Sequence, residues 1–325
     1  IKHLSKESFS FKNVGEAQAT RNSSQDAINS IAKVLPTFFG GSADLSHSNM
    51  TFIKGDGLQD DAHRTERNIQ FGVREFAMAT VLNGMMLHGG VRVFGGTFFV
   101  FSDYLKAALR LSALQNLPVT YVFTHDSIAV GEDGPTHEPI EHLASLRTIP
   151  NTYVFRPADA TETQAAWYLS QNVNDKPTSI VLTRQNLPVL EKSSFEKVAK
   201  GAYVVYETSS DFDTILIATG SEVALAISVA QELEREGMKV RVVSMPSIEL
   251  FEEQTSEYKE ALLPRSIRRR VSLEMGNTAL WYKYVGLDGL AIGINKFGAS
   301  APANKVIEEY GFSVEKVVAR IKNEL

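Results

Sequence analysis

Residues 104–124 read YLKAALRLSALQNLPVTYVFT, and this stretch decides the fold class. Its leucines and alanines recur at helical spacing, which predicts a helix over Tyr104–Gln115. Pro118 closes that helix, and Val119–Thr124 is a short apolar run typical of a buried strand. A helix that leads directly into a buried strand predicts a parallel sheet covered by helices on both faces.

The same alternation continues on both sides of this stretch. Further strands of the first half are predicted at Thr37–Gly40, Asn68–Phe71, Val91–Phe94 and Thr178–Thr183. Asp159 followed by Glu162 is typical of a capping box, which predicts a helix over Ala160–Gln171. We therefore expect the first half to be an α/β domain built on one sheet.

The second half restarts the pattern after a polar segment. Residues 192–201 lack strong periodicity, so we place a domain boundary there and expect domains over 1–192 and 193–325. A βαβ unit follows, with its strand, helix and strand at Thr214–Thr219, Val223–Glu236 and Lys239–Met245. The Gly220-Ser turn could hold an anion at the helix N-terminus, but a turn without a ligand is the simpler interpretation. The expected fold class is α/β, with two doubly wound domains on mostly parallel sheets.

Composition excludes several kinds of protein and site. The 325 residues include no cysteine, which excludes disulfides and thiolate chemistry and fits a reducing, cytoplasmic location. The formal net charge is −5 with both signs interspersed, which gives no indication of nucleic-acid binding. No apolar run reaches the roughly 18 residues of a membrane span, and no signal peptide is visible. Because the chain begins with Ile1 rather than Met, we expect a trimmed or partial polypeptide.

Polar side chains gather directly after the predicted strands of the first half. The loops concerned begin at Gly41, Gly72, Gly95, His125 and Arg184. Ligands of open α/β sheets bind outside the carboxyl ends of the strands. We therefore expect these five loops to converge on one ligand site.

The residue types in these loops complement one another chemically. Donors and possible cations, suited to a phosphate or an oxyanion, are Arg21, His125, His137 and Arg184. Glu75 and Asp133 are acceptors. Phe98, Phe101 and Tyr104 lie at three-residue spacing, and such a stripe alone indicates core packing. Beside a glutamate on a neighbouring loop, the stripe favours a stacked heteroaromatic ring.

Six motifs that contain these residues resemble transketolase, in the order of that family. They are GGSADL at 40–45, GVRE at 72–75, GGTF at 95–98, THDSIAVGEDGPTH at 124–137, RPAD at 156–159 and LTRQNL at 182–187. The similarity covers essentially the whole chain, and the longest motif is far more specific than a short glycine motif. The resemblance implies a thiamine-diphosphate pyrimidine-binding domain followed by a transketolase C-terminal domain. It also implies transfer of a two-carbon ketol unit between sugar phosphates, in the pentose phosphate pathway.

The resemblance further implies a role for each candidate residue. Glu75 matches the glutamate that hydrogen-bonds the aminopyrimidine ring and so promotes loss of the proton from the thiazolium carbon. Residues around the cofactor would be Phe98, Phe101, Tyr104 and, near the subunit interface, Asp44. Asp133 and His137 match contacts to the donor sugar, and His137 would join Glu75 as a catalytic residue. The phosphate clamp at the mouth of the channel would consist of Arg21, Ser48, His125 and Arg184.

The sequence departs from the transketolase pattern in two respects. Position 76 is Phe where many family members have His, although the neighbouring Glu75 is kept. The first domain of the family, which holds the diphosphate and its Mg²⁺ or Ca²⁺, has no counterpart. Gly55-Asp-Gly57 and Asn83 reproduce the spacing of the diphosphate motif, but Asn83 lies in a helical stretch where the motif needs a strand end. We interpret this match as a surface turn and expect no metal ligand in the chain.

These departures shape the expected assembly and activity. The chain would carry half of each site, form a homodimer, and be inactive without a first domain from a longer chain or a separate subunit. Alternatives are the same half of a deoxyxylulose-phosphate synthase or a dehydrogenase β-subunit, or a non-catalytic interaction module. The phosphate clamp and the GEDGPTH sequence favour transketolase over the first two. The complete set of pyrimidine-half residues weighs against the third.

Overall fold

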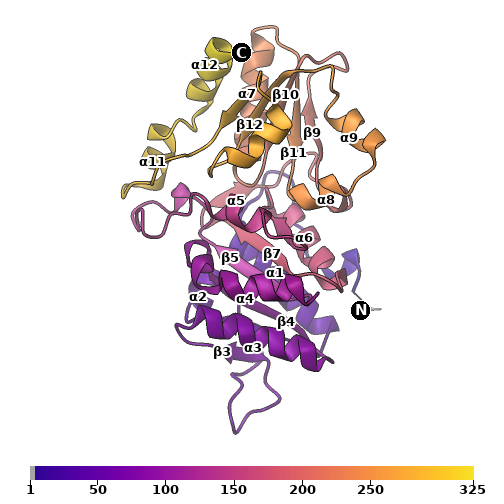
Figure 1. The fold of residues 1–325 in the computed structure, drawn as a ribbon, viewed down its shortest axis with the longest axis vertical. Coiled ribbons are helices and arrows are strands. Elements are labelled where there is room, and N and C mark those ends of the chain that lie inside the picture. Colours follow the sequence, from indigo (N-terminus) through magenta and orange to yellow (C-terminus); the bar gives the residue numbers. More distant parts are fainter. Residues whose placement is uncertain (1–3) are drawn as a thin grey trace.

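Two α/β domains lie end to end along the long axis of the molecule (Figure 1). The computed structural model describes residues 4–325, so Ile1, on which the expectation of a partial polypeptide rests, lies outside the described residues. Each domain contains its own central sheet, and most strands in both sheets are parallel. The predicted fold class is confirmed.

The sheet of the first domain has six strands, all parallel, in the order β3-β2-β4-β5-β7-β6. Its strands are β2 (Phe38–Ser42), β3 (Asn68–Gln70), β4 (Arg92–Phe98), β5 (Thr120–Thr124), β6 (Tyr153–Phe155) and β7 (Thr178–Leu182). Five of them lie where the apolar runs predicted strands. The edge strand β6 was not predicted, although Tyr153–Phe155 is an apolar run.

Helices cover both faces of this sheet. They are α1 (Thr20–Val34), α2 (Ser46–Asn49), α3 (Glu75–His88), α4 (Ser102–Leu114), α5 (His142–Arg147) and α6 (Ala160–Asn172). Alternate strand residues divide between the faces, as the pleat requires. Tyr121 and Phe123 pack in the cluster of α3 and α4, whereas Val122 packs in the cluster of α1 and α6. The short 3-10 helices are η1 (Lys6–Ser8), η2 (Phe99–Phe101) and η3 (Ile128–Val130).

The ends of two predicted helices show how local signals act. Helix α6 begins at Ala160 as predicted, because the Asp159 carboxylate accepts a hydrogen bond from the Glu162 amide at 2.9 Å. The Glu162 carboxylate accepts from the Ala158 amide at 2.7 Å, one residue before the donor of an ordinary capping box. Helix α4 begins two residues earlier than predicted, directly after η2.

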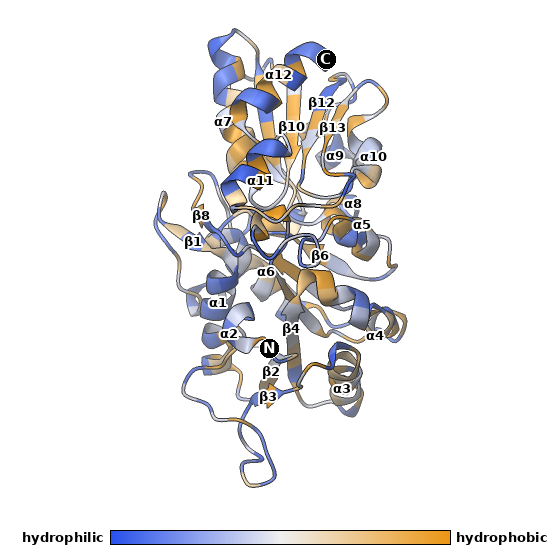
Figure 2. Ribbon diagram, turned by 90° about the vertical axis from the view of Figure 1, so that its left-hand side faces the viewer, coloured by the Kyte–Doolittle hydropathy of each residue, from blue (hydrophilic) through white to orange (hydrophobic). Residues whose placement is uncertain are grey.

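The sheet of the second domain has five strands in the order β13-β12-β10-β11-β9, and only β9 is antiparallel to its neighbour. The strands are β9 (Tyr203–Glu207), β10 (Thr214–Ala218), β11 (Val240–Ser244), β12 (Arg269–Leu273) and β13 (Leu290–Ile292). The helices are α7 (Glu222–Arg235), α8 (Ile248–Glu252), α9 (Ser256–Leu262), α10 (Tyr282–Val285), α11 (Ala303–Glu309) and α12 (Val314–Glu324), with η5 (Ala279–Trp281). Figure 2 shows the hydrophobic strands β10 and β12 beside α7 and α12, whose outer faces are hydrophilic. The predicted βαβ unit is present as β10, α7 and β11.

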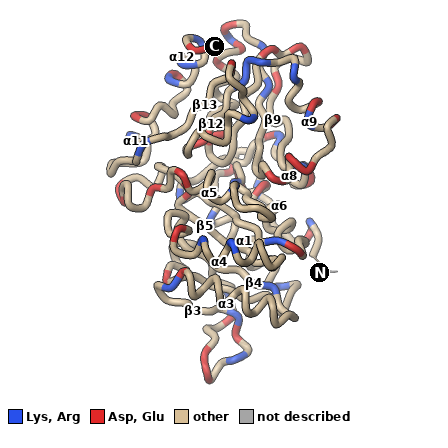
Figure 3. The backbone as a smooth tube through the Cα atoms, in the orientation of Figure 1, with Lys and Arg blue, Asp and Glu red and all other residues tan. Residues whose placement is uncertain are grey.

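The segment between the domains contains little regular structure. A two-stranded antiparallel sheet of β1 (Ala17–Ala19) and β8 (Asn186–Pro188) precedes it, and the 3-10 helix η4 (Lys197–Lys200) lies within it. The boundary between 192 and 193 falls in this segment and stays a prediction. Lys and Arg are interspersed with Asp and Glu along both domains (Figure 3). Among the described helices, none has the length and apolar character that a membrane crossing requires.

A network of buried ion pairs crosses from one domain to the other. We call it the interdomain ion network, and its members are Asp126, Arg147, Arg156, Glu222 and Glu274. Each of these side chains is at most 2% exposed. Gly220 lies so close to this network that an added Cβ would be 2.8 Å from the Arg156 guanidinium. The N-terminus of α7 is therefore covered by Arg156, which favours the interpretation of the Gly220-Ser turn as a turn without a ligand.

Candidate functional site

The predicted site residues lie at the carboxyl edge of the first sheet. Because β2, β3, β4, β5 and β7 are parallel, the loops that follow them leave the sheet at this common edge. Side-chain contacts join three of these loops directly: residues 42–49 contact the end of β5, and Phe98 contacts His125. Glu75 opens helix α3 directly after β3 and the Gly72 turn.

Aromatic rings and histidines form one cluster at this edge. The Phe98 ring centroid is 4.0 Å from that of His125 and 5.9 Å from that of Phe101, on which it stacks. Phe101 in turn lies 5.9 Å from Tyr104 and 5.5 Å from His137. Phe98 and Phe101 are half-buried and Tyr104 is exposed, so part of this aromatic surface remains open to a ligand. A stripe that served only core packing would be covered.

A chain of hydrogen bonds fixes the ring of His125. The Ser42 hydroxyl donates to the Asn49 side-chain oxygen at 2.6 Å, and the Asn49 amide nitrogen donates to the Thr124 hydroxyl at 2.7 Å. The Thr124 hydroxyl lies 2.8 Å from Nδ1 of His125. Because this hydroxyl already accepts from Asn49, its own proton can go to Nδ1, which leaves the Nε2 proton of His125 available to a ligand.

His125 is a neutral donor in an uncommon backbone conformation. Its φ is 64°, a region that costs free energy for a residue other than glycine and that clusters at functional sites. Burial, together with the charges of Arg21 and Arg184 and the proximity of His137, lowers the pKa of His125 to about 3. His125 is therefore uncharged at neutral pH.

Two arginines at this edge lie close enough for their charges to interact, and neither has a counter-ion within residues 4–325. Arg21, in the first turn of α1, donates to the Ser48 carbonyl at 2.9 Å, and Arg184 follows β7. Burial and the positive charge of Arg184 lower the pKa of Arg21. No carboxylate within residues 4–325 forms an ion pair with either guanidinium, and Nε of Arg21 is buried without a hydrogen-bond partner there. Two uncompensated cations beside a neutral donor favour an anionic ligand.

Glu75 is a nearly buried carboxylate that lacks protein partners. It is 9% exposed, and no side chain within the described range 4–325 donates to its carboxylate or pairs with it. As the first residue of α3, it carries its negative charge in the first turn, where the helix dipole favours an anion. An acceptor held in this way suits a ligand that offers an N–H group.

The remaining predicted residues lie in two surface loops. Asp133 is exposed and His137 half-buried, and Nδ1 of His137 lies 2.9 Å from the Thr136 hydroxyl. Asp44 is exposed, with a φ of 63° that a non-glycine residue rarely adopts. Its loop also contains Ser48, whose carbonyl accepts from Arg21.

Residue-type reasoning missed three residues that support the site. Asn49, which is fully buried, was given no role. Asp126 and Arg156 were quoted in motifs but were given no role. A signal for Arg156 was present, because an arginine directly after an apolar run, as in Tyr153–Phe155, is placed at a strand end. Its carboxylate partners lie far away in the sequence and could not be identified.

The rejected metal motif is explained by other contacts. Asp56 forms an ion pair with Arg67 at 2.5 Å, and its neighbour Gly57 donates to Glu66. Asn83 is buried between α3 and α4, where it donates to the Ala108 carbonyl at 3.0 Å. Neither end of this motif therefore faces the other across a ligand site. Within residues 4–325, one group of three side chains that could ligate a metal ion lies close together: Asp103, Glu141 and His142. Lys106 already forms an ion pair with Asp103 at 3.0 Å.

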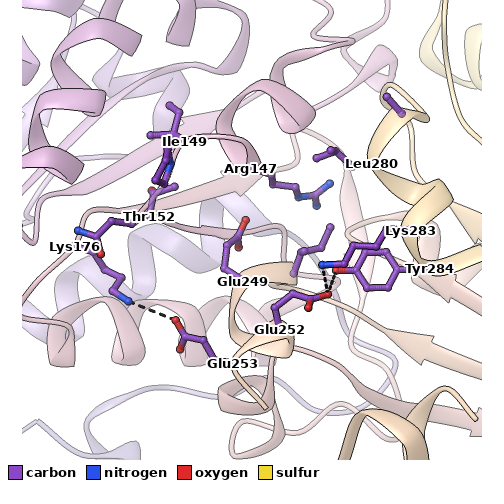
Figure 4. Close-up of a pocket in the computed structure, with 14 residues that line it drawn as sticks. Arg147, Ile149, Thr152, Lys176, Glu249, Glu252, Glu253, Leu280, Lys283 and Tyr284 are labelled. Carbon is purple, nitrogen blue, oxygen red and sulfur yellow. Dashed lines mark hydrogen bonds and ion pairs between the residues drawn. The ribbon is translucent and has the colours of Figure 1, made fainter. Parts of the chain in front are cut away.

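A cavity of about 660 Å³ opens between the two domains at the amino edge of the first sheet (Figure 4). Arg147 and Thr152 of the first domain and Glu249 and Tyr284 of the second contribute to its lining. None of the predicted site residues lines it. The cavity is therefore separate from the cluster at the carboxyl edge.

Comparisons with known proteins match this architecture. The family described as transketolase, pyrimidine binding domain, matches residues 16–189, and the transketolase-like C-terminal domain matches residues 201–313. This chain belongs to the transketolase family. A probable transketolase of Streptococcus pneumoniae serotype 4 is 71% identical over 309 residues, which cover 95% of this chain and 47% of that protein. The chain thus spans about half the length of the curated transketolases that it matches.

Solved transketolase structures share the fold of the whole chain. A Pichia stipitis transketolase in complex with sedoheptulose 7-phosphate superposes with a TM-score of 0.94 at 41% identity and covers 98% of this chain, which spans 47% of that one. A protein described as a split gene transketolase, inactive β4 tetramer, superposes with a TM-score of 0.75 at 26% identity. There the match covers 94% of this chain and 98% of the other. A transketolase half of this extent therefore exists as a separate chain.

Proposed function

We propose that this chain supplies the pyrimidine half of a transketolase active site and binds a sugar phosphate there. The observation that carries the proposal is the pair Arg21 and Arg184, two guanidinium groups without a counter-ion beside the neutral donor His125. A planar guanidinium can hold a phosphate through two hydrogen bonds, and two of them offset its double charge. Ser48 completes this phosphate clamp. The sedoheptulose 7-phosphate in the Pichia stipitis complex is a ligand of the same chemical class.

The residues present fit thiamine diphosphate at the adjoining position. Glu75 is an acceptor without a donor within residues 4–325, and Phe98, Phe101 and Tyr104 present a partly open aromatic surface. Such a surface stacks on a pyrimidine ring, while the carboxylate accepts from the ring nitrogen. When bound, the cofactor supplies a nucleophilic thiazolium carbon for ketol transfer. Its Mg²⁺ or Ca²⁺ would be held by the first domain of the family.

The other residues would hold the sugar. His137 lies beside Phe101 at the aromatic cluster and would donate to the two-carbon fragment as it is transferred. Asp133, exposed in the same loop, would accept from a sugar hydroxyl. His125, kept neutral, donates through Nε2 without adding a charge that would trap the product phosphate.

The assembly that we propose is at least a homodimer, completed by a first domain. Helix α3 supports it, because its sequence is apolar almost all round while one side is exposed in the isolated chain. The exposed apolar residues of α3, of α4 and of the turn before α3 are Val73, Phe76, Val81, Leu87, Tyr104, Leu111 and Leu114. Exposed apolar residues on two helices that pack together indicate a protein interface. Asp44 and Glu75 lie at the ends of the neighbouring loops, and Phe76 adds to the apolar face where many relatives have His.

We also propose that the chain has no appreciable ketol transfer alone. The diphosphate and metal contacts that hold the cofactor would belong to the first domain, and a split gene transketolase that this chain matches over 98% of its length is described as an inactive β4 tetramer. A cytoplasmic location fits the absence of cysteine. The alternatives are another thiamine enzyme and a non-catalytic module. The two arginines of the phosphate clamp, which lack a counter-ion within residues 4–325, favour neither alternative.

The test is reconstitution. This chain is mixed with the separately produced first domain of the Streptococcus pneumoniae relative, and we call the mixture the completed enzyme. We expect ketol transfer from xylulose 5-phosphate to ribose 5-phosphate only in the completed enzyme with thiamine diphosphate and Mg²⁺. A mass measurement confirms that the chain is intact, at 35.8 kDa. Robust turnover by the chain alone, or cofactor binding without any transfer in the mixture, would contradict the proposal.

A further inference from the structure

The transketolase C-terminal domain contributes no residue to the site described above, yet it contacts two loops that do. We propose that this domain positions the substrate-binding loops: it holds His125 through Arg156 and Asp126, and it holds the loop 131–138 through Ser300. The inference rests on the proposed phosphate clamp for its function. The contacts themselves do not depend on it.

The first contact fixes the residue that follows His125. Arg156, which is fully buried, binds the Asp126 carboxylate through Nε at 3.0 Å and Nη2 at 2.8 Å. Both residues belong to the first domain. Both guanidinium nitrogens lie against the same carboxylate oxygen, Oδ2, which fixes the position of that oxygen. Because Asp126 adjoins His125 in the chain, this carboxylate determines where the strained backbone of His125 is held.

The C-terminal domain in turn fixes Arg156. Its Nη1 forms an ion pair with Glu222 at the start of α7 and donates to the Thr219 hydroxyl at 3.0 Å. The Thr219 hydroxyl donates to Glu274 at 2.5 Å, and Glu274 accepts two hydrogen bonds from Arg147. The guanidinium is thus held by one carboxylate from each domain.

The second contact holds the loop of Asp133 and His137. The Ser300 hydroxyl donates to the Glu132 carbonyl at 2.6 Å. A Cβ at Gly134, whose φ is 76°, would lie 3.0 Å from Ser300, and a Cβ at Gly298 would overlap the Glu138 carboxylate. Two glycines, one from each domain, therefore permit the close packing of this loop on residues 298–300. The loop has no strand or long helix of its own to hold it.

The backbone of His125 explains why such support is needed. A φ of 64° is disfavoured for histidine and persists only where the surroundings determine it. The side chain is held within the first domain, through Thr124 and Asn49. The backbone on the other side is held by Asp126, and hence by the C-terminal domain. We therefore classify Arg156, Glu222 and Ser300 as positioning residues.

The test uses the 325-residue chain and observes the histidines directly. The chain has seven histidines, so their ring C–H signals are resolved by NMR after labelling, and His125→Gln and His137→Gln assign the two of interest. Glu222→Gln keeps the shape of Glu222 but removes the charge that holds Arg156. Ser300→Ala removes the hydroxyl that holds Glu132. Matched controls on α7 are Glu232→Gln and Ser228→Ala, which alter a half-buried and an exposed residue on the outer side of the same domain, away from Arg156.

We expect Glu222→Gln to shift the His125 signals and Ser300→Ala to shift those of His137, while both controls leave them unchanged. Inorganic phosphate, titrated as the probe, should bind about tenfold more weakly to Glu222→Gln, the change expected for one lost hydrogen bond to a charged group. If Glu222→Gln fails to fold in a thermal melt, Thr219→Val replaces it, because it removes one Arg156 contact without a buried charge change.

Unchanged His125 signals in a folded Glu222→Gln or Thr219→Val chain would overturn positioning of His125, and unchanged His137 signals in Ser300→Ala would overturn positioning of the loop. A purely stabilising interface would lower the melting temperature without moving these signals. Failure of the parent chain to bind phosphate would instead count against the phosphate clamp. The two failures are therefore distinguishable.

Discussion

Arg21 and Arg184 lie far apart in the sequence, yet burial and the nearby charge of Arg184 together lower the pKa of Arg21. Like charges are brought together in proteins where a ligand of opposite charge compensates them. The internal ion pair that would make Arg184 a structural residue is not formed with any carboxylate within residues 4–325. This relationship gives the first prediction.

Arg184→Ala in the completed enzyme should raise KM for ribose 5-phosphate by about ten- to a hundredfold, because one charged hydrogen bond is worth roughly 1.5–3 kcal/mol. The turnover number should change less, since the contact is remote from the reacting carbon. KM for unphosphorylated ribose should hardly change. Steady-state kinetics with both acceptors measure this, and Arg265→Ala, at a side chain that is 93% exposed, is the control. Equal losses for both acceptors would remove Arg184 from the clamp.

Glu75→Gln should slow proton exchange at the thiazolium carbon of the completed enzyme by about 10²–10⁴-fold, the scale of a general acid–base contribution. The substitution keeps the side-chain shape and removes the charged acceptor. Exchange into deuterated water, followed by NMR after an acid quench, measures the rate. Glu66→Gln, in an exposed loop of the same domain, is the comparison. An unchanged rate in folded Glu75→Gln would show that another group activates the cofactor.

Asn49→Leu should lower the free energy of unfolding by about 1–3 kcal/mol, because the buried Ser42 and Thr124 hydroxyls lose their common partner. The same change should weaken phosphate binding, since Nδ1 of His125 loses the constraint on its tautomer. Urea unfolding and phosphate titration measure the two effects. Asn174→Leu, on the surface, should produce neither. Loss of stability with unaltered phosphate affinity would restrict Asn49 to a structural role.

Glu138→Gln should stabilise the chain at pH 8 and have little effect near pH 4.5. Burial, with a smaller contribution from Asp133, raises the pKa of Glu138 from 4.5 to about 7. Between these values the folded state keeps a proton that the unfolded state has lost, so stability falls as pH rises. The glutamine mimics the protonated form and removes this loss, by about 1 kcal/mol or more.

Thermal melts of Glu138→Gln and the parent across this pH range provide the measurement. Glu132→Gln, at an exposed neighbour in the same loop, should show no such pH dependence. A stabilisation that is the same at both pH values would indicate a packing effect instead of a proton effect.

The chain should sediment at least as a dimer at tens of micromolar, because α3 presents an exposed apolar face. The double substitution Val81→Glu and Leu87→Glu should shift it toward the monomer. Leu287→Glu, at an exposed leucine of the other domain, should leave sedimentation unchanged. A parent chain that is monomeric under these conditions would contradict the proposed assembly.

Much of the fold could be predicted from the sequence because its signals are local. The apolar runs of β5 and β10, the spacing of α4 and the cap at Asp159 each depend on neighbouring residues. Parallel strands then place the loops that follow them at one edge. Strand β6 was missed, and its place at the sheet edge depends on its pairing with β7, which is distant in the sequence.

The electrostatics of the site could not be predicted in the same way. The low pKa of His125 results from burial and from Arg21 and Arg184, which come from opposite ends of the domain sequence. The partners of Arg156 lie 30 and 66 positions away, and nothing near it in the sequence identifies them. Residue types show which side chains can carry a charge. The fold determines which of these side chains are charged at neutral pH and which charges they face.

The interdomain ion network also limits how this polypeptide can be divided into modules. A truncation near residue 192 would leave Arg147 and Arg156 without Glu274 and Glu222, and would expose the apolar core that continues from Phe155 into the second domain. An uncompensated buried charge is among the most destabilising defects known. Fission or domain exchange at this point of the chain is therefore costly. The two domains can be told apart in the sequence, but each depends on the other for its stability.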